Sequence, residues 1–183
     1  MREIEVKARL TDEEAFLKKA EAKGILFGEP IEQLDVTFTN DTPHDDPLWT
    51  IFRIRQQGDK TILTMKYRAS ERSRDNHERE TEVSEAKQIA DMLERVGYTF
   101  DVQVRKTRRK AKYNGLEVCF DRVDQLGCFT EVESLAEDDA DVDAIQAELW
   151  NLLKELGAAE EDRVHKGYDT LMRKHKGMDE RYK

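Results

Sequence analysis

Apolar and charged side chains alternate strictly over residues 3–10, in the order Glu, Ile, Glu, Val, Lys, Ala, Arg and Leu. An alternation with a period of two predicts a β-strand that has two different faces. Similar segments recur along the chain, and two of them flank the turn-forming residues Gln57-Gly58-Asp59. The pattern predicts eight strands, at residues 3–10, 34–38, 49–55, 61–68, 77–83, 102–113, 116–121 and 129–134.

Apolar residues at helical spacing predict four helices between and after these strands. The first helix is expected to begin at Thr11, which forms a capping-box pattern with Glu14, and to end at Gly24. The second helix is expected to begin at Ser84 and to end at Gly97. The last two helices carry apolar stripes at Val142, Ile145, Leu149, Leu152 and Leu156, and at Val164, Tyr168, Leu171 and Met172.

The order of these elements predicts one domain. Both halves of the chain contain a strand, a helix, a glycine and an aromatic restart, which falls at residues 24–27 and again at 97–100. No linker-like segment separates the halves, so we expect a single domain over residues 1–175 and a tail without functional weight over residues 176–183. The turn-rich segment 40–47 and the polar segment 70–76 are expected to be loops.

The composition excludes several classes of protein. The 183 residues carry a formal net charge of −9, which argues against non-specific binding of nucleic acid. No stretch approaches the roughly 20 apolar residues of a membrane span, and the first residues have no apolar signal core. We therefore expect a cytoplasmic protein, in which Cys119 and Cys128 are inert thiols.

Whole strand faces carry charges of one sign. Lysine and arginine dominate single faces at residues 53–55, 66–68 and 106–110, whereas glutamate dominates faces at 78–82 and 131–133. One interpretation is an antiparallel sheet with a core on one face and water on the other. The second interpretation is a closed barrel, because four helices with apolar stripes need an apolar sheet face to cover. In such a barrel the charged faces would point inward and line a polar tunnel.

A polyphosphate with its metal ion is the ligand that fits such a tunnel. Lysine and arginine donors would hold the phosphate oxygens, and arginine offers bidentate contacts. The carboxylates would hold Mg²⁺ or Mn²⁺, since both are hard cations that prefer oxygen ligands. An acidic chain binds a polyanion only where its cations gather locally, and alternation along the strands would gather them. The candidate cofactor is therefore Mg²⁺ or Mn²⁺.

Several segments resemble motifs of the CYTH superfamily, the triphosphate tunnel metalloenzymes. Glu3-Ile4-Glu5-Val6-Lys7 resembles the ExExK signature of the family's first strand. Residues 121–133 are similar to the late strand pair of the class IV adenylyl cyclase branch. The chain departs from the family pattern at Thr37, where a tyrosine is more usual, and at Gly167-Tyr168, where a Ser-Tyr pair often occurs. The segments that resemble the cationic strands are Phe52-Arg53-Ile54-Arg55, Lys66 and Lys106-Thr107-Arg108.

The resemblance implies an α+β fold, namely a closed eight-stranded antiparallel β-barrel with helices packed outside and a triphosphate tunnel inside. The metal ligands that it implies are Glu3, Glu5, Asp121, Glu131 and Glu133. The triphosphate ligands that it implies are Lys7, Arg53, Arg55, Lys66, Lys106 and Arg108. The residues expected to take part in catalysis are Glu5, Lys7, Asp121 and Glu131. Glu80 and Glu82 stay open, either as tunnel carboxylates or as partners for arginines.

The resemblance points to an enzyme, and two reactions share this set of residues. The likeness to the class IV branch at residues 7–9 and 126–129 favours adenylyl cyclase, which converts ATP to cyclic AMP and pyrophosphate. The alternative enzyme is a triphosphatase that hydrolyses inorganic triphosphate, thiamine triphosphate or a nucleoside triphosphate. A third hypothesis is a non-catalytic polyphosphate-binding module, which would not need the carboxylates. The expected partner is a small-molecule triphosphate rather than nucleic acid or membrane, and the family also allows a homodimer.

Overall fold

The computed structural model of the chain describes residues 2–42, 46, 48–68, 76–137 and 139–178. In this part the chain adopts an α+β fold, as predicted, with eight strands and four α-helices. The strands are β1 (Arg2–Leu10), β2 (Ile31–Thr39), β3 (Thr50–Gln57), β4 (Lys60–Arg68), β5 (Asn76–Val83), β6 (Thr99–Tyr113), β7 (Leu116–Val123) and β8 (Gly127–Ala136). The helices are α1 (Glu13–Ala22), α2 (Ala86–Arg95), α3 (Val142–Glu155) and α4 (Tyr168–His175).

Each predicted strand is present, and the turn between β3 and β4 lies at Gly58-Asp59, as expected. Gly58 has a φ of +56°, a conformation in the left-handed region that glycine adopts without strain. The predicted loop at 40–47 includes residues 43–45 and 47, which lie outside the described part of the chain. The same holds for residues 70–75 of the polar segment and for residues 179–183 of the predicted tail.

The helix boundaries differ from the predicted ones. Asp12, and not Thr11, is the N-cap of α1, because its Oδ1 accepts a 2.9 Å hydrogen bond from the amide of Ala15. The N-cap of α2 is Glu85 rather than Ser84. The last helix begins at Tyr168, so Val164 lies outside it and its amide donates a 2.9 Å hydrogen bond to the carbonyl of Lys7 on β1. None of the described helices combines the length and hydropathy that a membrane span needs.

The strands are hydrogen-bonded in the order β1-β8-β7-β6-β2-β3-β4-β5. Neighbouring strands whose register is defined are antiparallel. Among the described residues this order has two ends, at β1 and β5, so closure of the sheet into a barrel stays a prediction. The chain divides into two compact units, residues 1–31 with 106–166 (unit 1) and residues 32–105 with 167–183 (unit 2), and each is described by itself.

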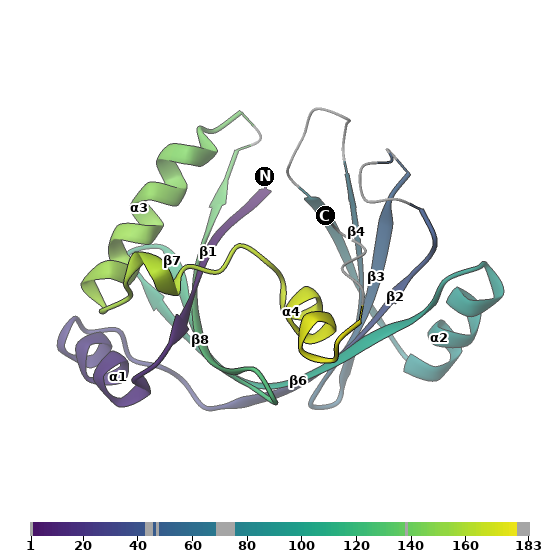
Figure 1. Ribbon diagram of the computed structural model, residues 1–183, viewed down its shortest axis with the longest axis horizontal. Helices are drawn as coiled ribbons and strands as arrows, with labels where there is room; N and C mark the ends of the chain where they lie inside the picture. Colours follow the sequence, from purple (N-terminus) through teal and green to yellow (C-terminus); the bar gives the residue numbers. More distant parts are fainter. Residues whose placement is uncertain (1, 43–45, 47, 69–75, 138, 179–183) are drawn as a thin grey trace. The chain divides into compact units, whose positions relative to one another are not determined.

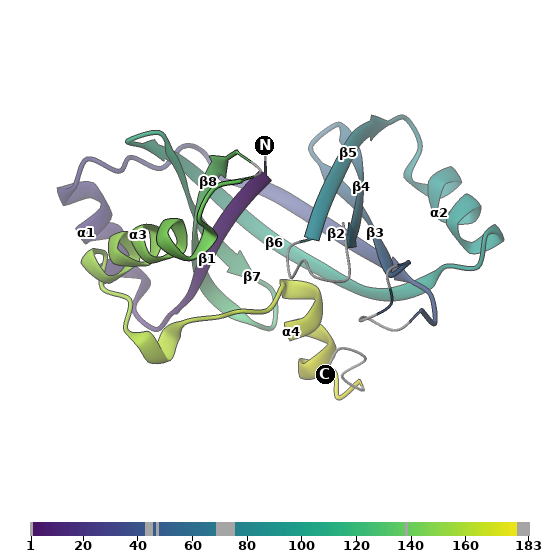
Figure 2. The ribbon, with the colours of Figure 1, turned by 90° about the horizontal axis from the view of Figure 1, so that it is seen from above.

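Unit 1 contains β1, β7, β8 and the second part of β6, and α1 and α3 belong to it (Figure 1). The apolar residues of β1, including Ile4 and Val6, alternate with its charged residues and are buried in one cluster with Phe16 of α1 and Leu153 of α3. Figure 2 shows α3 running beside β1 and β8. Since one face of these strands is filled by the helix-covered core, the charged residues lie on the opposite face.

Unit 2 contains β2 to β5, the first part of β6, and helices α2 and α4. Its apolar face is closed by α2, whose Leu93 packs with Phe38 of β2 and Ile54 of β3. On α4, the buried Arg173 donates a hydrogen bond to Asp101 of β6. On β3, Arg53 and Arg55 flank the buried Ile54, which packs with Leu93 of α2, so the two arginines lie on the face that α2 leaves uncovered.

Candidate functional site

The pairing of β1 with β8 brings together carboxylates that are far apart in the sequence. The register places Glu5 opposite Glu133 and Lys7 opposite Glu131. Glu3 lies two residues before Glu5 and so shares its face of the sheet. Four of the five predicted metal ligands thus come from two strands that are direct hydrogen-bonded neighbours within unit 1.

The next two strands of unit 1 add the fifth predicted metal ligand and two predicted phosphate ligands. Asp121 on β7 lies opposite Arg108 on β6, and both side chains are buried. The guanidinium of Arg108 contacts Asp121 in a bidentate pair, with Nε–Oδ1 and Nη2–Oδ2 distances of 2.7 and 2.6 Å. Lys106 precedes Arg108 by two residues on the same face and is also buried. The alternation therefore delivers cations and carboxylates to one face of the same unit.

Glu131 is enclosed by these cations. Its Oε1 lies 3.0 Å from the Nζ of Lys7, and its Oε2 accepts a hydrogen bond from Arg108. Burial would raise the pKa of Glu131, but the charges of Lys7, Arg108 and Lys106 outweigh burial and hold that pKa well below its usual value. Burial likewise opposes the charge of Lys7, but Glu131 and Glu5 keep the pKa of Lys7 above its usual value. Both groups are therefore charged at neutral pH and form a compensated buried pair.

Glu133 has a different environment, although it is only two residues away. The nearest nitrogen of Arg108 lies 3.6 Å from its carboxylate, and oxygens of Glu133, Glu3 and Glu5 lie within 4.8 Å of one another. Burial raises the pKa of Glu133 to about 8; Arg108 opposes the rise, whereas the charges of Glu3, Glu131 and Glu5 add to it. A group of carboxylates that repel one another is suited to a divalent cation with oxygen ligands. The residues present therefore fit Mg²⁺ or Mn²⁺.

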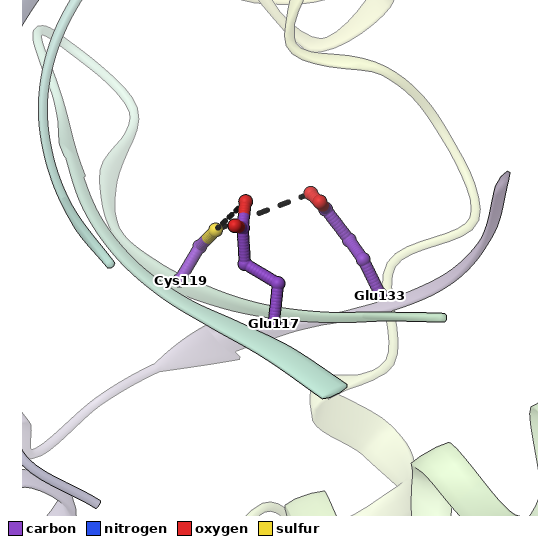
Figure 3. Close-up of side chains that lie close together, drawn as sticks. All are labelled: Glu117, Cys119 and Glu133. Atoms are coloured by element: carbon purple, nitrogen blue, oxygen red, sulfur yellow. Dashed lines mark hydrogen bonds between the residues drawn. The ribbon is translucent and has the colours of Figure 1, made fainter. Parts of the chain in front are cut away.

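A second group on this face consists of Glu117, Cys119 and Glu133 (Figure 3). The thiol of Cys119 lies 3.8 Å from Glu117 Oε1 and 4.0 Å from Glu133 Oε1. Glu117 already contacts two cations, since its oxygens lie 2.5 Å from Lys110 and 2.8 Å from Lys112. Burial raises the pKa of the Cys119 thiol, so the sulfur is protonated and is a poor metal ligand at neutral pH. The Glu3–Glu5–Glu133 group is therefore the better candidate for a cation.

The charged face of unit 2 pairs each predicted phosphate ligand with a carboxylate. Arg55 forms a bidentate contact with Asp35, at 2.7 and 2.8 Å. Lys66 lies 2.7 Å from Glu78, and Arg53 lies 3.0 Å from Glu80. Burial would raise the pKa of Glu78, but Lys66 and Arg53 outweigh it and lower that pKa.

The two carboxylates that the sequence left open have cationic partners in this unit. Glu80 contacts Arg53, as expected if it is a partner for an arginine. Glu82 pairs with the exposed Lys60 at 3.1 Å.

Several residues on these faces, among them Glu117 and Thr64, were not among the predicted site residues. Glu117 lies opposite Glu133 in the pairing of β7 with β8, and Thr64, which is fully buried, donates a 2.7 Å hydrogen bond to Glu80. The alternation along β7 places Glu117 on the charged face, but only the strand register shows which carboxylate it meets. Thr64 carries no charge, so no sequence signal distinguishes it from an ordinary strand residue.

The fold and these faces define a class of protein. It is an α+β protein whose antiparallel sheet has one helix-covered face and one face where carboxylates and buried cations lie side by side. The model of the CYTH domain matches residues 1–168, and the chain therefore belongs to the CYTH family. The resemblance noted in the sequence motifs is thereby confirmed.

Individual relatives agree with this assignment. The chain is 23% identical over 172 residues to the "Putative adenylate cyclase MJ0240" of Methanocaldococcus jannaschii, a match that covers 93% of this chain and 98% of the relative. The PH1012 protein of Pyrococcus horikoshii is 28% identical, with a TM-score of 0.76 over 92% of this chain and 98% of that one. HpAC1 of Hippeastrum, described as a "putative adenylyl cyclase" with a dominant triphosphatase activity, has a TM-score of 0.64 at 19% identity and covers 97% of both chains. At that identity, the likeness to HpAC1 shows the fold alone.

Proposed function

We propose that the protein is a metal-dependent enzyme that acts on a triphosphate. The observation that carries this proposal lies within unit 1, where the Glu3–Glu5–Glu133 group shares a sheet face with the buried cations Lys7, Lys106 and Arg108. A protein that binds only anions would gain nothing from mutually repelling carboxylates, whereas a metal–triphosphate complex presents both charges.

The proposed metal ligands are the five carboxylates implied by the motifs, Glu3, Glu5, Asp121, Glu131 and Glu133. Among these five, the contacts favour Glu3, Glu5 and Glu133 as metal ligands. Asp121 already pairs with Arg108, and Glu131 already pairs with Arg108 and Lys7. A divalent cation bound there would neutralise charge on phosphate oxygens and favour ionisation of an attacking oxygen. Catalytic roles are proposed for Glu5, Lys7, Asp121 and Glu131.

The proposed phosphate ligands are Lys7, Lys106 and Arg108 of unit 1 and Arg53, Arg55 and Lys66 of unit 2. Lysine and arginine would stabilise the charge that develops on the phosphate oxygens as a bond to phosphorus breaks. Enclosure of the ligand by a closed barrel belongs to the same proposal. Four further predictions of the sequence stay predictions. They are a small-molecule substrate, the absence of nucleic acid or membrane partners, a homodimer and a cytoplasmic location.

The first candidate reaction is the cyclisation of ATP. In this reaction the ribose 3′-oxygen attacks the α-phosphorus, the hydroxyl loses its proton, and pyrophosphate leaves. The name of the Methanocaldococcus relative and the class IV-like segment at residues 126–129 support this choice. The cations of the charged faces would stabilise the leaving pyrophosphate.

The second candidate is hydrolysis of the terminal phosphate, and the triphosphatase activity stated for HpAC1 favours it. Cyclisation and hydrolysis need the same metal and cations, and they differ in which oxygen attacks which phosphorus. The identity of the product therefore separates them.

The decisive experiment is to incubate the protein with ATP, tripolyphosphate or thiamine triphosphate in Mg²⁺ or Mn²⁺ and to identify the products by chromatography. Cyclic AMP with pyrophosphate would support the cyclase, and orthophosphate from any of the three would support the triphosphatase. Glu133→Gln should abolish either activity, whereas the control Glu14→Gln, on an exposed position of α1, should not change it. Binding of these compounds without any product would contradict the enzyme and favour a binding module.

A further inference from the structure

Thr64 lies between two residues of opposite charge on the charged face of unit 2. The register places Arg53 of β3 opposite Thr64 of β4, and Thr64 opposite Glu80 of β5. Arg53 and Glu80 are therefore on strands that are not neighbours, and Thr64 is the residue between them. Because the side chain of Thr64 is short, Arg53 Nη2 can reach across β4 to Glu80 Oε1, at 3.0 Å.

The hydroxyl of Thr64 contacts both of these charged residues, although the side chain is fully buried. Its Oγ1 donates a 2.7 Å hydrogen bond to Glu80 Oε1 and accepts a 3.2 Å hydrogen bond from Arg53 Nη2. A hydroxyl has one proton to donate and lone pairs to accept with, so Thr64 can serve both partners at once. Together with the direct contact between Arg53 and Glu80, these bonds form a closed triangle.

The guanidinium of Arg53 is held through a single nitrogen. Among the described residues, its Nη2 contacts Thr64 and two carboxylates of β5, whereas its Nε is buried without an acceptor. Arg55 on the same strand differs, because Asp35 holds both its Nε and its Nη2. The orientation of Arg53 therefore depends on the contacts of Nη2, and none of these contacts uses the donors of Nη1.

We propose that Thr64 is a positioning residue, which with Glu80 fixes the guanidinium of Arg53 and leaves its Nη1 donors for an oxygen of the triphosphate. This inference rests on the proposed function, in which Arg53 is a phosphate ligand. A phosphate oxygen would gain the Nη1 contact without displacing Thr64 or Glu80. A guanidinium that is already oriented loses less side-chain entropy on binding than a mobile one, so the hydroxyl of Thr64 contributes to affinity without touching the substrate.

The first test removes the hydroxyl and keeps the shape of the side chain. Thr64→Val should raise KM for the triphosphate by about fivefold, as expected for the loss of one hydrogen bond, and should change kcat by less than about twofold. Thr64→Ser keeps the hydroxyl and should restore the wild-type KM. In an Arg53→Ala background, Thr64→Val should raise KM no further, because Thr64 acts through Arg53. A wild-type KM in Thr64→Val, or a further rise in the double variant, would overturn the proposal.

The matched control is Thr37→Val, on the other side of Arg53. Thr37 of β2 is opposite Arg53 in the register and is also buried, but its hydroxyl donates to the backbone carbonyl of Val102 at 3.1 Å. Thr37→Val should therefore keep the wild-type KM and kcat. An equal rise of KM in Thr37→Val and Thr64→Val would show a general disturbance of the sheet and would contradict a specific role of Thr64.

A second pair of variants tests the same triangle if Thr64→Val does not fold. Glu80→Gln weakens the charge-assisted contact with Arg53, whereas Glu82→Gln removes the same charge from the same strand face at a residue that pairs with Lys60. KM should be at least about threefold higher in Glu80→Gln than in Glu82→Gln. Equal KM values in these two variants would overturn the proposal.

Binding measurements separate a failure of this inference from a failure of the proposed function. A wild-type protein that binds tripolyphosphate but converts no triphosphate would contradict the proposed enzyme. The Kd for tripolyphosphate, measured by calorimetry, would then replace KM in each comparison and would still test Thr64. A wild-type protein that binds neither tripolyphosphate nor ATP would contradict both proposals.

Discussion

At the scale of single residues, two glutamates on one strand face opposite electrostatic conditions. Glu131 and Glu133 share a face of β8, yet Glu131 has two cations within ion-pair distance and Glu133 has one at 3.6 Å. The pKa of Glu131 is therefore lowered, whereas that of Glu133 is raised to about 8. The direct contacts of Lys7 and Arg108, rather than burial alone, decide the difference, because burial raises the pKa of both groups.

The raised pKa of Glu133 predicts a pH-dependent gain in stability for Glu133→Gln. A carboxyl with a folded-state pKa of about 8 contributes its full stability below its ordinary value of 4.5 and loses it as the pH rises through 8. In metal-free buffer, Glu133→Gln should therefore unfold at a higher urea concentration than wild type at pH 8. The difference should shrink as the pH falls toward 5. Equal urea midpoints at pH 8 would contradict the repulsion among these carboxylates.

For Glu131→Gln we expect a loss of stability, the opposite of the effect of Glu133→Gln. The amide removes a buried charge that compensates Lys7 and Arg108, and breaking such a pair costs about 3–5 kcal/mol. Because the folded-state pKa of Glu131 is lowered, its stabilisation is present above the ordinary carboxyl pKa and is lost as the pH falls. Urea unfolding at pH 7 should show the loss, and wild type and variant should converge at acid pH. A variant as stable as wild type at pH 7 would show that these ion pairs contribute nothing.

At the scale of elements, the start of α1 shows how local geometry selects between neighbouring residues. Thr11 and Asp12 are both good capping residues, and the side chain of Asp12 accepts the hydrogen bond from Ala15. Asp12→Ala should lower the free energy of unfolding by about 1 kcal/mol. Thr11→Ala is the matched control, and it should cost clearly less. Chemical denaturation of both variants checks that Asp12 is the N-cap. Equal losses of unfolding free energy in the two variants would contradict that assignment.

The strands of unit 2 carry the second set of predicted phosphate ligands. Arg53 on β3 contacts Glu80 and Thr64, and its replacement removes a charge-assisted contact worth about 1.5–3 kcal/mol if Arg53 binds the substrate. Arg53→Ala should therefore raise KM for the triphosphate by about tenfold or more. The control Lys60→Ala removes an exposed cation of β4 and should leave KM unchanged. Wild-type kinetics in Arg53→Ala would exclude contact with the substrate.

At the scale of the whole molecule, the proposed cation links ligand binding to folding. A ligand that binds only the folded chain stabilises it by about 2.7 kcal/mol at 100 times its dissociation constant. Mn²⁺ should therefore raise the Tm of wild type, and a chelator should reverse the rise. Hydrogen exchange should slow in β1 and β8, which carry Glu3, Glu5 and Glu133, more than in β3 to β5. Slower exchange confined to β3–β5 would place the metal elsewhere.

Sequence patterns place the proposed site residues on strand faces, but they do not show which residues these side chains contact. Alternation assigns Glu3, Glu5, Glu131 and Glu133 to strand faces, because the period of two is a local property of the backbone. Which carboxylate meets which cation depends on the register between strands that are more than 100 residues apart, as for Lys7 and Glu131. That register is fixed by packing of the apolar faces, so no local pattern shows that Lys7 meets Glu131. Arg108 and Asp121 differ, because they face each other across the hairpin of β6 and β7, where the turn at Asn114-Gly115 sets the register.

The sequence by itself determined the eight strands, the α+β class and the CYTH membership, because each rests on local periodicity or on short motifs. The predicted helix starts were less accurate, because capping depends on whether one side chain reaches one backbone amide, as that of Asp12 does. Only the tertiary structure decided the strand order, in which β1 pairs with β8 and β6 lies between β7 and β2. It also gave Glu131 and Glu133 different electrostatic environments, because charge compensation depends on distances of a few ångströms between residues brought together by folding.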